Sequence, residues 1–226
     1  MKTIIQTPTP NYELSCNFYK KIGYAIDKIE GKTYLHSKGV TIELNEDRFS
    51  RAGLKCFGNN WTQFLIDCGL MPNATKTPNG FLITSPCGCP IYLEDMPKQI
   101  PQSEQTPLIG NFAGFSLETN QMEESSQFWA LFGYKQTMGN IDQGWLALSN
   151  DEGFSISLMK YQCCPHIFLN PSLSYFNGTD NLSIIKQVKE AGIAITEEIT
   201  HFNPEGIVDN IIIQDPAGLG FFIFSD

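Results

Sequence analysis

The stretch that decides the fold is IIIQDPAGLGFFIF, residues 211–224, at the end of the chain. Two runs of β-branched and aromatic residues flank the segment Asp-Pro-Ala-Gly, a composition typical of two strands joined by a tight turn. Proline presets φ at the second turn position, and glycine accepts the positive φ that often follows. The chain therefore ends in a predicted β-hairpin, and a similar stretch, FLITSPCGCPIYL, occupies residues 81–93.

The elements before these two hairpins repeat in one order. The first unit is predicted to contain a strand, a helix that ends near Gly23, and three short strands up to residue 44. Its helix end, FYKKIGY at 18–24, has the same spacing of aromatic pair, Gly and Tyr as FWALFGY at 128–134. With a weaker unit at 51–95 and a fourth at the C-terminus, the chain is predicted to hold four β-α-β-β-β units in two pairs.

A change in composition marks the boundary between the pairs. Residues 96–107, MPKQIPQSEQTP, contain three prolines and three glutamines and are nearly free of apolar side chains. Such a segment is typical of a linker. We expect a first domain at 1–97 with a degenerate second module, a linker at 98–108 and a second domain at 109–226.

The composition excludes several classes of partner. The 226 residues carry a net charge of -9, and lysine and arginine are dispersed along the chain. Nucleic acids and anionic membranes require a basic face, so neither is an expected partner. No apolar run approaches the ~20 residues of a membrane helix, and the N-terminus lacks the apolar core of a signal peptide. A monomer and a homodimer both remain open.

The seven cysteines indicate reduced thiols. Cys87 and Cys89 are too close for an easy disulfide, Cys163 and Cys164 are adjacent, and no spacing is typical of a zinc site. No paired base is apparent for any of them, so buried or incidental cysteine is the preferred interpretation. A cytoplasmic location is expected on these grounds.

The repeated motifs resemble the vicinal oxygen chelate superfamily, which includes glyoxalase I, bleomycin-resistance proteins, fosfomycin-modifying enzymes and extradiol dioxygenases. The resemblance is carried by the two helix ends, by Asp-Pro-x-Gly at Asp215, and by Lys-Glu-Ala-Gly at 189–192. It implies an α+β fold in which four βαβββ modules pair into two glyoxalase-like domains. Each domain would hold a U-shaped cleft of mixed sheet with ligand inside.

The resemblance also indicates where metal ligands would lie. Members with metal use a His or Gln early in the first strand of a module and a Glu in the last strand. The first-strand positions fall at or within about one residue of Ile4, Leu54, Gly114 and Leu173. The last-strand positions fall at Glu43, Tyr92, Ser157 and Phe222. Because only Glu43 is a metal-binding residue, no metal or other cofactor is expected; a divalent metal held by Glu43 and His36 is the alternative.

Strand alternation directs a set of aromatic and polar side chains into the clefts. In the first half the candidate ligand-binding residues are Tyr34, His36, Thr41, Glu43 and Tyr92. In the second half they are Trp145, Ser155, Ser157 and Phe222. Aromatic walls with a few polar groups are the usual form of a small-molecule pocket. Glu43 as a solvated strand carboxylate and Phe222 as a core residue are the alternatives, and His166 and His201 are expected at the surface.

Three functions remain compatible with the sequence. The favoured one is binding of a small organic molecule in an aromatic-lined cleft without metal, as in the bleomycin-resistance branch. The second is a diverged metal-dependent lyase or dioxygenase of the glyoxalase type that uses Glu43 and His36. The third is a structural or sensory module with clefts filled by side chains. The first half is the expected location of the site, since it combines polar and aromatic groups and its loose segment 70–80 predicts a more open wall.

Overall fold

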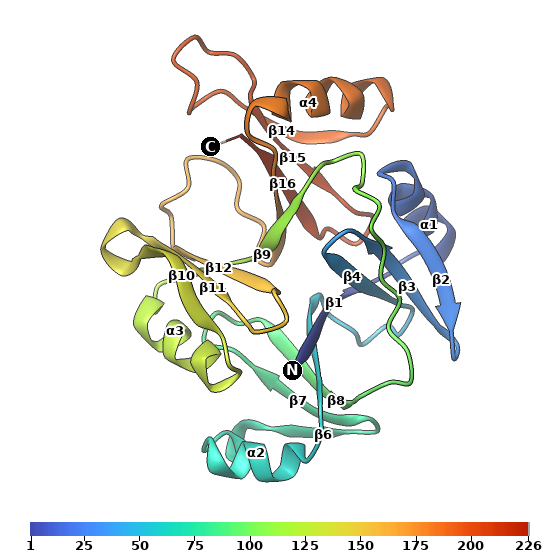
Figure 1. Cartoon of the computed structure of the whole chain (residues 1–226), viewed down its shortest axis with the longest axis vertical. Helices are drawn as coiled ribbons and strands as arrows, with labels where there is room; N and C mark the ends of the chain where they lie inside the picture. Colours follow the sequence, from blue (N-terminus) through green and yellow to red (C-terminus); the bar gives the residue numbers. More distant parts are fainter. Residues whose placement is uncertain (226) are drawn as a thin grey trace.

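The computed structural model describes residues 1–225 and contains two eight-stranded mixed sheets with four helices around them (Figure 1). The first half holds β1 (Lys2–Pro8), α1 (Tyr12–Lys21), β2 (Ala25–Ile29), β3 (Lys32–Ser37), β4 (Val40–Asn45), β5 (Gly53–Gly58), α2 (Trp61–Asp67), β6 (Thr75–Thr77), β7 (Gly80–Thr84) and β8 (Pro90–Asp95). The second half holds β9 (Phe112–Thr119), α3 (Met122–Leu131), β10 (Lys135–Asn140), β11 (Trp145–Ser149), β12 (Ser155–Lys160), β13 (Ser172–Phe176), α4 (Asn181–Glu190), β14 (Ile195–Ile199), β15 (Asn210–Gln214) and β16 (Gly220–Phe224). Short 3₁₀ turns lie at Met71–Asn73, Ile141–Gln143 and Gly178–Asp180.

Both sheets have the same strand order, which confirms the predicted fold of four paired βαβββ modules. The orders are β2-β3-β4-β1-β5-β8-β7-β6 and β10-β11-β12-β9-β13-β16-β15-β14. Within each half the two modules join through their first strands, β1 with β5 and β9 with β13, both antiparallel. The final hairpin is β15 and β16, and its echo is β7 and β8. None of the described helices is long and apolar enough to cross a membrane.

The connection between the sheets runs along the first sheet. The connecting segment, residues 96–111, lies between β8 and β9 and has no helix or strand (Figure 1). Thr41 Oγ1 donates to the Pro101 carbonyl at 2.9 Å, and the Lys38 amide donates to the Gln105 carbonyl at 2.9 Å. These bonds hold the segment against β3 and β4. Asp226, the last residue of the expected second domain, lies outside the described residues.

The internal repeat extends to individual side chains. Phe18 and Tyr19 meet edge to face with ring centroids 5.3 Å apart, and Phe128 and Trp129 meet in the same way at 5.3 Å. At the start of each helix a threonine pairs with a serine, Thr9 with Ser15 at 2.7 Å and Thr119 with Ser125 at 3.1 Å. The matched helix ends predicted from the sequence therefore occupy equivalent places.

The two halves share one hydrophobic core, because the first module of each half packs against the second module of the other half. Tyr24 of the first half hydrogen-bonds through its hydroxyl to Tyr175 of the second. Phe64 of α2 contacts Phe132 after α3, with centroids 5.1 Å apart. Tyr134 donates to Thr3 Oγ1 at 3.1 Å. The halves are thus joined by burial of aromatic surface, with hydroxyl groups paired inside it.

One carboxylate anchors this junction. Asp215 Oδ1 accepts from the amides of Ala217 and Leu219, and Oδ2 accepts from Thr7 Oγ1 and the Tyr19 hydroxyl, both at 3.0 Å. Burial raises the pKa of Asp215, although these four donors act in the opposite direction. The turn that was recognised from Asp-Pro-Ala-Gly therefore also ties the end of the chain to α1 and β1.

The equivalent position in the other half lacks the carboxylate. Ser85 begins the corresponding turn, and its Oγ accepts from the Cys89 amide at 3.1 Å. Trp129, which matches Tyr19, has a buried Nε1 without a hydrogen-bond partner among residues 1–225. The two junctions therefore share a turn geometry but differ in their buried polar groups. The Tyr19 hydroxyl has an acceptor, whereas Trp129 Nε1 has no partner among residues 1–225.

Asp215→Ala is expected to destabilise the protein by about 3 kcal/mol, because buried hydroxyl and amide donors lose their acceptor. Ser85→Ala, at the equivalent turn, should cost about 1 kcal/mol because one amide loses its partner. Urea denaturation of both variants measures the difference. Equal losses would show that the Asp215 side chain does not anchor the junction.

Candidate functional site

The register of the first sheet decides which side chains meet on its inner face. Glu43 lies between Tyr34 and Gln6 on neighbouring strands. Lys55 lies opposite Ile4 on one side and Tyr92 on the other. The inward position of β5 is therefore Lys55, one residue beyond Leu54, which is fully buried in the main core. In the second half the same register gives Ser174 in place of Leu173.

Four charged side chains form a closed network around Glu43 and Lys55. It is here called the lysine–glutamate cluster and consists of Lys32, Glu43, Lys55 and Glu94. Lys55 Nζ lies 2.8 Å from Glu43 Oε1 and 2.9 Å from Glu94 Oε1. Lys32 Nζ lies 3.2 Å from Glu94 Oε2 and 3.6 Å from Glu43 Oε2. Two cations balance two anions, which is the condition under which buried charge is tolerated.

The inner face of the first sheet is covered by side chains at its centre. A small apolar cluster is formed by Ile4, Tyr34 and Phe57. Two further side chains pack against it, Ile29 at the end of β2 and Ile100 of the connecting segment. His36 and Thr41, expected to face a ligand, are both buried. His36 Nε2 bonds to Asp27 Oδ2 at 3.0 Å. The expectation of a more open first cleft is therefore wrong at its centre, because the connecting segment covers it.

A cavity of about 640 Å³ remains at the edge of this half. Its wall includes Ile29, Lys32, Tyr34, Trp61, Phe81 and Glu94, with Pro97 and Gln99 of the connecting segment. Trp61 Nε1 donates to the Glu94 carbonyl at 2.9 Å, which fixes the indole beside the cluster. Of the expected site residues, Tyr34 lines this cavity, whereas Glu43 lies behind Lys32 and Tyr92 bonds through its hydroxyl to the Arg51 amide.

Sequence reasoning missed Lys32, Lys55 and Glu94. A signal for Lys55 was available, since it interrupts the apolar strand GLKCFG at 53–58. A lysine is rarely buried without a charged partner, so its place in that strand implied a carboxylate opposite. The partner could not be chosen from the sequence, because Glu43 and Glu94 come from different strands, β4 and β8.

The inner face of the second half is lined by hydroxyl groups and rings and lacks an equivalent of Glu43. Ser157 takes that place, opposite Ser116. Ser116 and Ser174 pair through their hydroxyls at 2.7 Å, and Ser149 pairs with Ser155 at 2.9 Å. Trp145, Ser155, Ser157 and Phe222 are all half-buried. This face is uncharged where the first half carries the lysine–glutamate cluster.

His166 was expected at the surface but is half-buried against Phe222. The two rings stack with centroids 4.6 Å apart at 24°, and Phe222 in turn stacks on Phe224 at 4.8 Å and 3°. The loop between β12 and β13 carries His166 back over the sheet. His201 is exposed, as expected.

Comparison with solved structures confirms the fold. A homoprotocatechuate 2,3-dioxygenase from Arthrobacter globiformis matches 99% of this chain and 78% of its own with a TM-score of 0.62 at 11% identity. A catechol 2,3-dioxygenase matches 97% and 85% with a TM-score of 0.57 at 15% identity. The 2,3-dioxygenase LapB from Pseudomonas sp. KL28 matches 99% and 91% with a TM-score of 0.56 at 16% identity. The chain has the vicinal oxygen chelate fold.

At such identities the likeness concerns the vicinal oxygen chelate fold alone. No family model and no curated protein match the sequence.

The divalent metal that this fold holds in many members does not fit the residues present. Glu43, the one retained ligand, already bonds to the Lys55 ammonium, and His36 bonds to Asp27. Within residues 1–225, no three or more His, Cys, Asp and Glu side chains are grouped so that they could hold a metal ion. A metal near Glu43 would meet the positive charges of Lys55 and Lys32, which repel it.

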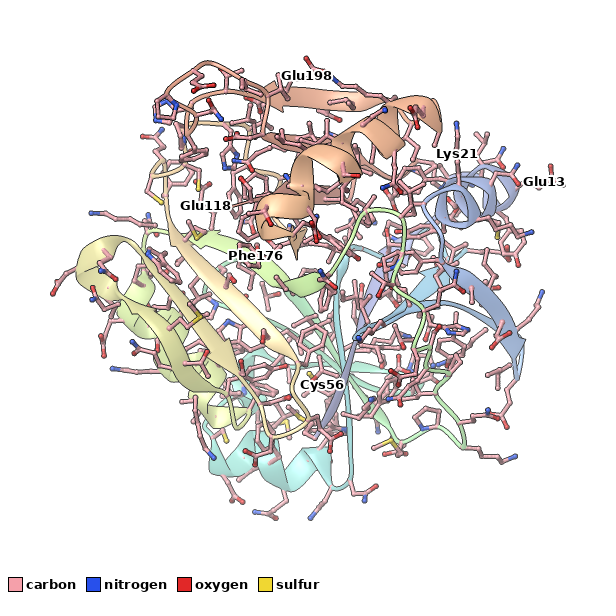
Figure 2. The ribbon with its side chains drawn as sticks, turned by 45° about the horizontal axis from the view of Figure 1, so that its top comes forward. Glu13, Lys21, Cys56, Glu118, Phe176 and Glu198 are labelled. Atoms are coloured by element: carbon pink, nitrogen blue, oxygen red, sulfur yellow. The ribbon has the colours of Figure 1, made fainter. Side chains whose placement is uncertain are left out.

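The thiols offer no nucleophile near the cluster. Figure 2 shows Cys56 in the middle of the molecule, while Glu13 and Lys21 project outward from α1. Burial raises the pKa of Cys56 to about 12 and also raises that of Cys89. A thiol with a raised pKa is rarely present as the reactive thiolate at neutral pH.

Lys55→Met is expected to destabilise the protein by about 3–5 kcal/mol, because Glu43 and Glu94 keep their charge in a buried place with one cation fewer. Urea denaturation measures the loss.

Lys135→Met is the matched control. The Lys135–Asp151 pair, at 3.3 Å, has side chains 75% and 86% exposed. Its loss should cost at most about 1 kcal/mol. A Lys55 variant as stable as this control would contradict the role given to the cluster.

Proposed function

We propose that this protein binds a small organic molecule in the cavity beside the lysine–glutamate cluster, without a divalent metal. The observation that carries the proposal is the 640 Å³ volume, which lies in the range of ligand pockets. Its wall combines the rings of Tyr34, Trp61 and Phe81 with the charged groups of Lys32 and Glu94. Aromatic surface with a few convergent polar groups is what a small-molecule site requires.

Binding is favoured over a metal-dependent lyase or dioxygenase reaction by the position of Lys55. Its ammonium group makes the contact with Glu43 that a metal would otherwise make. Unlike a metal ion, this cation is covalently part of the protein. The cluster therefore provides charge for recognition, and none of its members is placed to hold a metal.

A structural module with filled clefts is the second candidate, and the packing of Ile100 on Tyr34 and Phe57 favours it. In that case the connecting segment would be a permanent part of the core. The two functions predict different behaviour of the cavity. A binding protein takes up a specific ligand there, whereas a structural module does not.

Phe81→Ala is expected to weaken binding of a ligand found by thermal-shift screening about fivefold, because one aromatic wall contributes about 1 kcal/mol. Isothermal titration with the purified full chain measures the change. Trp145→Ala, on the inner face of the second half, is the control and should leave the affinity unchanged. The reverse pattern would place the site in the second half.

Metal analysis tests the other part of the proposal. The protein purified and dialysed without chelator is expected to hold only substoichiometric Ni, Zn, Fe or Mn, because Lys55 and Lys32 occupy the cationic positions around Glu43. Elemental analysis gives the ratio. A stoichiometric metal that survives dialysis and disappears in Glu43→Ala would disprove metal-free binding.

A further inference from the structure

The two lysines of the cluster differ in how firmly they are held. Lys55 is 3% exposed and hydrogen-bonds to the Oε1 atom of each glutamate. Lys32 is 35% exposed, lines the cavity, and faces the Oε2 atom of each glutamate. The cluster thus has a sealed inner cation and an outer cation that a molecule in the cavity could replace.

The outer position is incompletely satisfied. Glu43 Oε2 is buried and has no hydrogen-bond partner among residues 1–225. The Lys32 ammonium, at 3.6 Å, is within range of an ion pair and outside hydrogen-bond range, while its distance to Glu94 Oε2 is 3.2 Å. Leaving a buried carboxylate oxygen without a donor costs free energy. A better placed cation would recover it.

We propose that the cavity takes an organic cation, a primary amine on a flat or aromatic body, whose ammonium group displaces that of Lys32. The ammonium would donate to Glu43 Oε2 and Glu94 Oε2, and the body would lie against Trp61 and Phe81. This inference rests on the proposed function and specifies the class of ligand.

The exchange of cations is physically inexpensive. Lys32 is long and already half-exposed, so its ammonium can turn to water, and partly exposed ion pairs contribute little. A ligand ammonium gains charge-assisted hydrogen bonds in a more enclosed place, and aromatic faces attract cations. Because one positive charge replaces another, the cluster stays neutral throughout, and Lys55 need not move.

An anionic ligand would use the same cavity differently. It would bind Lys32 directly, helped by Lys76 in the cavity wall, and would lie close to Glu94. Its affinity would therefore depend on Lys32, whereas an amine competes with Lys32. The sign of the effect of a Lys32 variant separates the two classes.

The test compares three probes of similar shape: 2-phenylethylamine, 2-phenylethanol and 3-phenylpropanoate. Titration calorimetry with the full chain is expected to show binding of the amine in preference to the alcohol and the carboxylate. Lys32→Met, which keeps the apolar stem and removes the competing charge, should tighten amine binding about tenfold, equivalent to 1.4 kcal/mol.

Lys76→Met is the matched control, since it removes one positive charge from the same wall without touching a cluster carboxylate. A general electrostatic effect would change both variants alike, whereas displacement predicts less than about a twofold change for Lys76→Met. Glu94→Gln should abolish the preference of the wild-type protein for the amine over the alcohol.

Several outcomes would overturn the inference. They are binding of the amine no tighter than the alcohol in the wild-type protein, equal or weaker amine binding in Lys32→Met, and preferred binding of the carboxylate. The wild-type comparison stands even if a variant does not fold. A neutral or anionic ligand with an affinity lowered by Phe81→Ala would leave the proposed function intact, and only a screen without any cavity-dependent ligand would remove both.

Discussion

The first half depends on the contact of the Lys55 ammonium with Glu43 and Glu94. These three groups come from β5, β4 and β8, so the contact holds the inner faces of both modules of the sheet together. Burying three charges is costly unless each has a partner, and the geometry supplies one hydrogen bond from Lys55 to each glutamate. The fourth member, Lys32, completes neutrality at the edge where the cavity lies.

This arrangement distinguishes the two halves, which share one strand order. In the first half the inner face carries charge, and the connecting segment covers it with Ile100 and Pro101. In the second half Ser157 and Ser174 occupy the positions of Glu43 and Lys55, and the face stays neutral and half-exposed. Serine at both positions leaves no buried ion that needs a charged partner.

The junction between the halves shows a similar asymmetry. Asp215 satisfies Tyr19, whereas Ser85 leaves the indole of Trp129 without a partner among the described residues. A carboxylate can accept from four donors at once, and a serine hydroxyl cannot. The C-terminal hairpin is therefore tied to α1 through a carboxylate, whereas the β7–β8 hairpin meets α3 through the weaker contact of Cys87 Sγ with Ser125 Oγ at 3.3 Å. Burial of rings at both junctions keeps the two sheets in one core.

The sequence by itself determined the repeat, the paired modules and the final hairpin, because these follow from local patterns: strand alternation, the glycine that ends each helix, and the chemistry of the turn at Asp215. It also placed Glu43 on the inner face. Only the tertiary structure decided that Lys55 would meet Glu43 and Glu94, and that the connecting segment would cover His36 and Thr41. Those contacts join strands far apart in the chain, where a shift of one residue in register exchanges Leu54 for Lys55.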